Sequence, residues 1–174
     1  MKVMATVADR YKRWRHIRGY GIHSPSAYTI IREVLRPPRE YGYYAYDDLR
    51  KVVSPHKTFS ELCLIYRLIV WFHPDNIAIC ASDSADVLTT VARMACPFSN
   101  TGTSTPQADF VIVDKDYSEP LPSEAKIMFF FDTRSQLAGD IRRTMTAGHI
   151  FDGNRHTIIV RRHDLPLQTF TLNI

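Results

Sequence analysis

Short apolar runs alternate with amphipathic segments along the last two thirds of this chain, and that alternation limits the folds open to it. The apolar runs have the length and composition of buried strands, which we predict at 76–81, 109–113, 126–131, 156–162 and 167–173. Helical spacing of the apolar residues predicts helices at 58–72, 83–95 and 136–146. This order predicts an α/β fold with a mainly parallel, Rossmann-like sheet and a C-terminal antiparallel hairpin.

The N-terminal part of the chain has helical rather than strand patterning. Residues 8–17 have the spacing of a short charged helix. Ser24 followed by Pro25 is typical of a helix start, because the hydroxyl caps free amides and the proline has no amide to leave unpaired. A tyrosine-rich surface connection at 39–46 and a short helix at 47–53 follow. We expect residues 1–57 to form a basic helical extension packed on an α/β domain of residues 58–174, as one structural unit.

Composition sets further limits. The chain has 174 residues, of which 45% are hydrophobic, enough for one domain with a single core. No apolar run approaches the roughly 20 residues that cross a bilayer, and no secretory signal pattern is present, so we expect a cytoplasmic protein without membrane contact. The three cysteines, Cys63, Cys80 and Cys96, lack the spacing of zinc ligands or of a disulfide framework. We therefore expect no metal site.

Positive charge is concentrated at the N-terminal end of the chain. Six basic residues in positions 1–20 stand against Asp9 alone, so this segment carries +5 and the rest of the chain −1, which together give the net charge of +4. The basic side chains alternate with Tyr11 and Trp14, a pattern that suits phosphate contact combined with base stacking. If this arm binds nucleic acid, Arg13, Arg15 and Arg18 are the candidate contacts; packing on the sheet or on a second subunit is the alternative.

The other chemistry-bearing residues follow the predicted strands. Ligands of open α/β sheets bind at the carboxyl ends of the strands, where Asp114 and Asp132 follow neighbouring apolar runs. Two such acids are candidate catalytic residues or cation ligands, although acids at these positions also cap turns. His149, His156 and His163 recur at sevens, but we expect them in a helix end, a strand start and a turn, so the spacing is interpreted as coincidence.

Several stretches resemble one enzyme family. They are "ADFVIVDKDY", "IMFFFDTRSQLAGDIRRTM", the closing "HTIIVRRHDLPLQTFTLNI" and the run Gly21-Ile-His-Ser-Pro-Ser26. Together they resemble class I S-adenosylmethionine-dependent methyltransferases, and more narrowly a bacterial group that opens with a similar Gly-Ile-His-Ser-Pro stretch. The resemblance covers most of the chain and implies a methyltransferase-like sheet with an antiparallel hairpin at its edge.

The chain departs from that family where the family binds its cofactor. The resemblance implies an acid at the end of the first strand, followed by a glycine-rich loop; here Ile79 takes the acid position, and Ala81 and Ala85 take the glycine positions. An added methyl group fills the space that the cofactor needs and disfavours positive φ. The segment 96–108 is also too short for the family's next strand, helix and strand. The resemblance therefore implies a shortened relative that has lost the usual cofactor.

From these observations we expect a methyltransferase-like protein that has lost S-adenosylmethionine-dependent catalysis, has no cofactor and serves as a binding or assembly module, with a protein partner or a second copy of itself. One alternative is an active methyltransferase with an atypical cofactor loop formed by Ala81, Ser82, Asp83 and Ala85. A second alternative is a nucleic-acid-binding protein that uses the basic arm. The methyl acceptor, the partner and the oligomeric state do not follow from the sequence.

Overall fold

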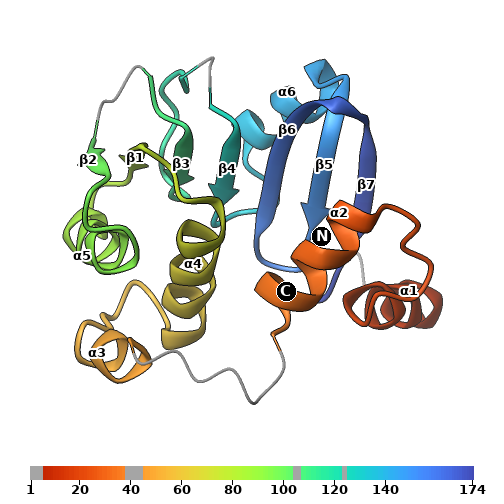
Figure 1. Ribbon diagram of the computed structural model, residues 1–174, viewed down its shortest axis with the longest axis horizontal. Coiled ribbons are helices and arrows are strands. Elements are labelled where there is room, and N and C mark those ends of the chain that lie inside the picture. The colour runs from red at the N-terminus through yellow and green to blue at the C-terminus, as the bar shows by residue number, and fades with distance from the viewer. Residues whose placement is uncertain (1–5, 38–44, 104–106, 123–124) are drawn as a thin grey trace.

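The computed structural model describes residues 6–37, 45–103, 107–122 and 125–174. In these ranges the chain forms an α/β fold around one mixed sheet of seven strands, in the order β2-β1-β3-β4-β6-β5-β7 (Figure 1). The strands are β1 (Asn76–Cys80), β2 (Asn100–Gly102), β3 (Phe110–Val113), β4 (Ile127–Phe130), β5 (Ala147–Asp152), β6 (Thr157–Pro166) and β7 (Gln168–Thr171). Every neighbouring pair is parallel except the two pairs that involve β6. The mainly parallel sheet with an antiparallel C-terminal hairpin is thus confirmed.

The helices of the described residues do not all begin alike, because three begin at a side-chain cap and four do not. They are α1 (Val7–Ile17), α2 (Pro25–Thr29), the π-helix η1 (Ile30–Leu35), α3 (Tyr46–Lys51), α4 (Phe59–Phe72), α5 (Ala85–Ala95) and α6 (Gln136–Thr144). Thr58 and Glu61 form a capping box at the start of α4, in which each side chain bonds the other residue's backbone amide. Ser24 caps α2, with Pro25 at the first helical position, as predicted.

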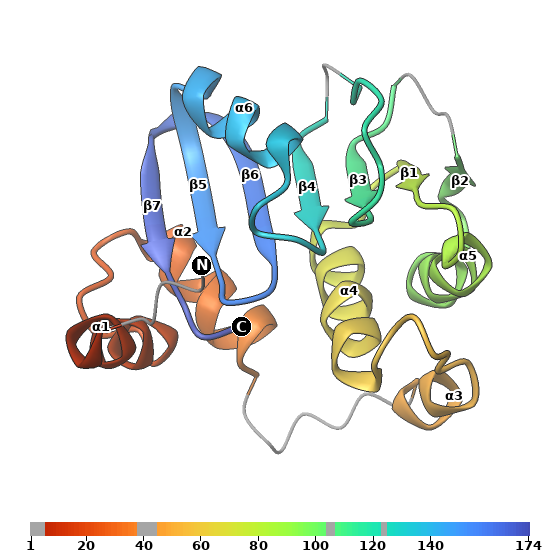
Figure 2. The same cartoon turned by 180° about the vertical axis from the view of Figure 1, so that it is seen from behind.

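Alternate residues of the central strands supply two apolar layers. Ile77, Ile79, Phe110 and Ile112 face a core that also contains buried residues of α2, η1, α4 and α5, including Ile31. The N-terminal extension therefore shares its core with the sheet. On the other face, strand residues such as Val111 and Met128 meet α6 and the segment that follows β3 (Figure 2).

Two strands were missed and one pairing was wrong in the sequence-based prediction. The stretch Ala147–Asp152 was expected at a helix end, yet it forms β5, which is paired on both sides, with β6 and with β7. The antiparallel hairpin is therefore β5–β6. The two predicted C-terminal strands do not pair with each other, because β5 lies between them. Asn100–Gly102, expected as loop, adds β2 at the sheet edge beside β1.

Other expectations hold in a modified form. The helix predicted from Pro25 continues beyond Thr29 as the π-helix η1, where Arg67 Nε donates to the backbone oxygen of Val34 at 2.7 Å. Most of the tyrosine-rich stretch 39–46 lies outside the described residues. Among the helices described, none is long and apolar enough to cross a membrane.

Candidate functional site

A pocket of about 510 Å³ opens at the carboxyl ends of β1 and β3. Three segments form it: the turn that precedes α4, the loop after β1 and the loop after β3. Its lining consists of Pro55, His56, Lys57, Ala81, Ser82, Asp83, Asp114, Lys115, Asp116 and Tyr117. This is the edge at which ligands of open α/β sheets bind, and the volume suits a small molecule.

Lys57 is the buried cation of this pocket, and its side chain is only 4% exposed. It immediately precedes the N-cap Thr58, and a β-bridge to Ser54 fixes the turn that carries it. The ammonium Nζ lies 2.8 and 2.9 Å from the two carboxylate oxygens of Asp114 and 3.9 Å from the ring centroid of Phe131. A buried ammonium needs such partners, because burial without them is costly.

The carboxylate of Asp114 is fully engaged by donors from this chain. Besides the two contacts with Lys57, Oδ2 accepts a 2.6 Å hydrogen bond from the hydroxyl of Ser84, and Oδ1 accepts a 2.8 Å bond from the Lys115 amide. Burial acts to raise the pKa of Asp114, but the hydrogen bonds from Lys57 and Ser84 outweigh it and hold that pKa below its ordinary value. Asp114 is therefore an ionised acceptor at neutral pH.

This arrangement limits the chemistry of Asp114. A carboxylate offers about four lone-pair sites, and four hydrogen bonds from three donor groups of this chain already use them. The group has no lone pair to spare for a proton of a substrate or for a metal ion unless Lys57 moves away. No group of three or more His, Cys, Asp or Glu side chains suited to a metal ion occurs in the described part of the chain.

The predicted pair of catalytic acids is not joined by a contact. Asp132 follows β4, next to β3, but its Oδ1 accepts a 2.9 Å hydrogen bond from the Arg134 amide in its own loop. Asp132 is also outside the pocket lining, whereas Asp114 is part of it. Each acid thus bonds a different part of the molecule.

The predicted cofactor-loop residues separate in a similar way. Ala81 and the exposed Ser82 and Asp83 line the pocket, whereas Ala85 is not in the lining and packs against the core. Ser84, between them, is 1% exposed and turns inward to Asp114. Ile79, in the position where the resembled family has an acid, is 1% exposed and belongs to the apolar core.

Sequence reasoning missed Lys57, Ser84 and Phe131. A signal for Lys57 was present, because a helix that leads directly into a parallel strand begins at the opposite end of that strand, which is the carboxyl edge of the sheet. The residue just before the capping box of α4 therefore had to lie near Asp114. No comparable signal in the sequence marks Ser84 or Phe131.

Phe131 connects this cluster to a second buried polar group. Its ring packs edge-on against the imidazole of His156, with centroids 5.9 Å apart, and His156 Nε2 lies 3.8 Å from Glu61 Oε1. Burial lowers the pKa of His156 more than the neighbouring Glu61 raises it. The imidazole is therefore neutral at neutral pH, and the contact with Glu61 is not an ion pair there.

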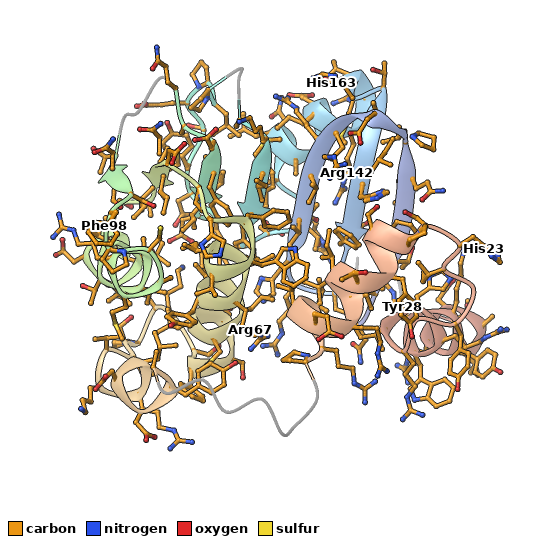
Figure 3. All side chains as sticks on the ribbon, in the orientation of Figure 1. His23, Tyr28, Arg67, Phe98, Arg142 and His163 are labelled. Carbon is orange, nitrogen blue, oxygen red and sulfur yellow. The ribbon has the colours of Figure 1, made fainter. Side chains whose placement is uncertain are left out.

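His149 lies in β5 and binds the cap of α2. Its Nε2 is 2.8 Å from the hydroxyl oxygen of Ser26 and 3.3 Å from that of Ser24, so the serines around Pro25 fix α2 to the sheet. His163 lies on β6 rather than in the predicted turn. The three histidines do not gather, in agreement with the interpretation of their spacing as coincidence. His23 is exposed and projects outward from the turn between α1 and α2 (Figure 3).

The three candidate nucleic-acid contacts divide between two faces of α1. Arg13 points inward, and its Nη1 donates to the backbone oxygen of Leu172 at 2.9 Å. Arg15 and Arg18 are exposed and lie over the rings of Tyr11 and Trp14. Arg13 thus anchors the helix, whereas the other two face solvent.

Comparison with known proteins adds no identification: no family model, no curated protein and no solved structure matches this chain.

Proposed function

We propose that this chain is a methyltransferase-like α/β protein that has lost S-adenosylmethionine-dependent catalysis and acts as a binding or assembly module. The observation that carries the proposal is the buried Lys57–Asp114 ion pair at the carboxyl edge of the sheet. It supports the proposal because the acid at the edge where such a cofactor would bind is engaged by Lys57 and is not free to bind a ligand.

Three features argue that S-adenosylmethionine does not fit these residues. The side chain of Ile79 is buried in the core and offers no carboxylate. The loop at Ala81 and Ala85 carries methyl groups where close backbone approach requires glycine. In its described residues, the segment between α5 and β3 forms only the three-residue strand β2, and its sequence holds no acid before Asp109 that would bind ribose hydroxyls. We therefore derive no methyl-transfer step.

The strand order is consistent with the proposed kinship. An antiparallel strand, β6, is inserted between β4 and β5 at one end of a parallel sheet. The resembled family has its antiparallel hairpin at the sheet edge, whereas here β7 pairs with β5 and adds one strand beyond the hairpin. The pocket that remains has a polar rim formed by Asp83, Lys115 and Asp116, which suits a polar ligand or the side chain of a partner.

Calorimetry with S-adenosylmethionine and its demethylated product tests the proposal. We expect no binding heat at ligand concentrations up to about 1 mM, a range that detects even weak sites. Stoichiometric binding with a micromolar Kd would overturn the proposal and favour an active methyltransferase with an atypical loop. In that event, Asp83→Ala, a substitution in the lining of the pocket, should weaken the binding of S-adenosylmethionine.

A further inference from the structure

Helix α1 is fixed to the sheet by one face only. On that face Arg13 donates to the Leu172 backbone oxygen, His16 Nδ1 lies 3.2 Å from the Thr171 backbone oxygen, and Ile17 is buried. These contacts set the rotation of α1 about its axis. The opposite face must therefore point to solvent.

We call this solvent face the α1 surface, defined by Arg10, Tyr11, Lys12, Trp14, Arg15 and Arg18. Tyr11 and Trp14 stack with ring centroids 5.9 Å apart and an interplanar angle of 20°. The guanidinium carbon of Arg18 lies 4.1 Å from the Trp14 centroid, and that of Arg15 lies 5.9 Å from the Tyr11 centroid. The rings nevertheless remain 58% and 43% exposed, so each keeps a large accessible area.

The charge of the α1 surface is uncompensated. Asp9, the one acid of α1, uses its carboxylate to cap the helix at Thr6. Within the described residues, no carboxylate forms an ion pair with Arg10, Lys12, Arg15 or Arg18. Such a surface attracts anions, and the binding of a polyanion to it is favoured by the release of the counterions condensed on that polyanion.

Trp14 also borders a pocket of about 420 Å³ between α1, η1 and α4. Leu35 and Leu64 give the pocket apolar walls, and Arg36 and Arg67 contribute two guanidinium groups. No acidic side chain is among its lining residues. Arg67 is held in place by its hydrogen bonds to the Val34 backbone oxygen and the Tyr46 hydroxyl. An aromatic residue and a fixed cation thus border a cavity of the size of a small planar group.

We propose that the α1 surface and this adjoining pocket bind single-stranded nucleic acid. Bases stack on Trp14 and Tyr11, one base enters the pocket, and the arginines bind the phosphates. Single strands fit better than duplexes, because only unpaired bases offer free faces to exposed rings. They also fit better than an acidic peptide, which would use the cations but not the stacked aromatic rings. The proposal is independent of the proposed function of the carboxyl-edge pocket.

Fluorescence anisotropy with a labelled oligothymidylate of about 15 nucleotides tests the proposal. At about 50 mM salt we expect binding that weakens steeply as salt rises. Trp14→Ala should weaken binding about tenfold, through lost stacking, and Trp14→Phe should restore most of it. Arg15→Glu combined with Arg18→Glu should weaken binding by tenfold or more and flatten the salt dependence.

Two control variants test whether a loss of binding is specific to α1. Trp71 on α4 is also 43% exposed, and Arg93 on α5 is exposed at the other end of the sheet from α1 (Figure 1). Trp71→Ala and Arg93→Glu should leave binding unchanged. No binding to the single strand, equal losses in these controls, equal affinity for the matching duplex, or full competition by polyglutamate would each overturn the proposal.

Discussion

The charge balance at the carboxyl edge depends on two side chains, Lys57 and Asp114, whose exposed fractions are only 4% and 17%. Neither charge is stable there without the other, because burial removes most of the water that would otherwise solvate it. The ring of Phe131 and the hydroxyl of Ser84 complete the cluster. Such a closed set of partners is typical of a structural element, and its energetic signature can be measured.

Removal of either charge alone should lower the free energy of unfolding strongly, whereas removal of both should lower it much less. We expect Asp114→Asn or Lys57→Met to lower the free energy of unfolding by about 3 kcal/mol, because each leaves a buried charge without its partner. The double variant Lys57→Met/Asp114→Asn should lose much less than the sum of the two single losses. Urea denaturation measures all three variants. Single losses that simply add would contradict the assignment of Lys57 and Asp114 as a coupled pair.

Two buried histidines make stability depend on pH. Burial lowers the folded-state pKa of His149 and His156 below the ordinary value of 6.5, so below that pH the unfolded chain takes up protons more readily than the folded chain. Their contribution to the free energy of unfolding is complete above pH 6.5 and is lost as the pH falls from there toward the folded-state pKa values. We expect the urea midpoint to fall between pH 7 and pH 5, and to fall less in His149→Gln. If the urea midpoint of His149→Gln fell with pH as steeply as that of the unsubstituted protein, His149 would not be a source of the pH dependence.

At the scale of the elements, β5 depends on the conformation of one glycine. Gly148 has φ +109° beside a bulge in the β5–β6 pairing, and a Cβ placed there would lie 2.2 Å from the Val160 backbone oxygen. Gly139 in α6 differs, because a Cβ there would meet no atom within 4 Å. The same substitution to alanine therefore tests backbone strain at Gly148 and helix propensity at Gly139.

We expect opposite effects from the same substitution at these positions. Gly148→Ala should lower the free energy of unfolding by about 2 kcal/mol or more and weaken hydrogen-exchange protection in β5 and β6. Gly139→Ala should raise it by about 0.5–1 kcal/mol through better helix propensity. A neutral Gly148→Ala would show that the start of β5 has a different backbone from the one described.

Some elements could be predicted because their signals are local. The capping box at Thr58 and Glu61, the Ser24–Pro25 start and the apolar runs of β1, β3 and β4 each carry their own evidence in adjacent residues. β5 and β2 could not be predicted in this way. The stretch around Gly148 is glycine-containing and the stretch around Asn100 is polar, and both become strands through pairing with neighbours distant in sequence.

At the scale of the whole molecule, the candidate site was only partly predictable, because some of its contacts join residues that are distant in sequence. Asp114, Ala81, Ser82 and Asp83 were found because they follow strands, and the structure places them around one pocket. The decisive partner, Lys57, comes from a turn 57 residues away in the sequence. The division of α1 into an anchoring face with Arg13 and an outer face with Arg15 and Arg18 likewise required the position of the last strand.

The proposed loss of cofactor binding depends on the saturation of the Asp114 carboxylate by hydrogen-bond donors of the protein itself. The most direct test is a pH titration of the Asp114 side-chain carboxyl carbon by ¹³C nuclear magnetic resonance. We predict a pKa below the ordinary aspartate value of 3.8, and a shift upward in Lys57→Met. A pKa at or above the ordinary value, unaffected by Lys57→Met, would mean that Lys57 does not hold this carboxylate and would contradict the account.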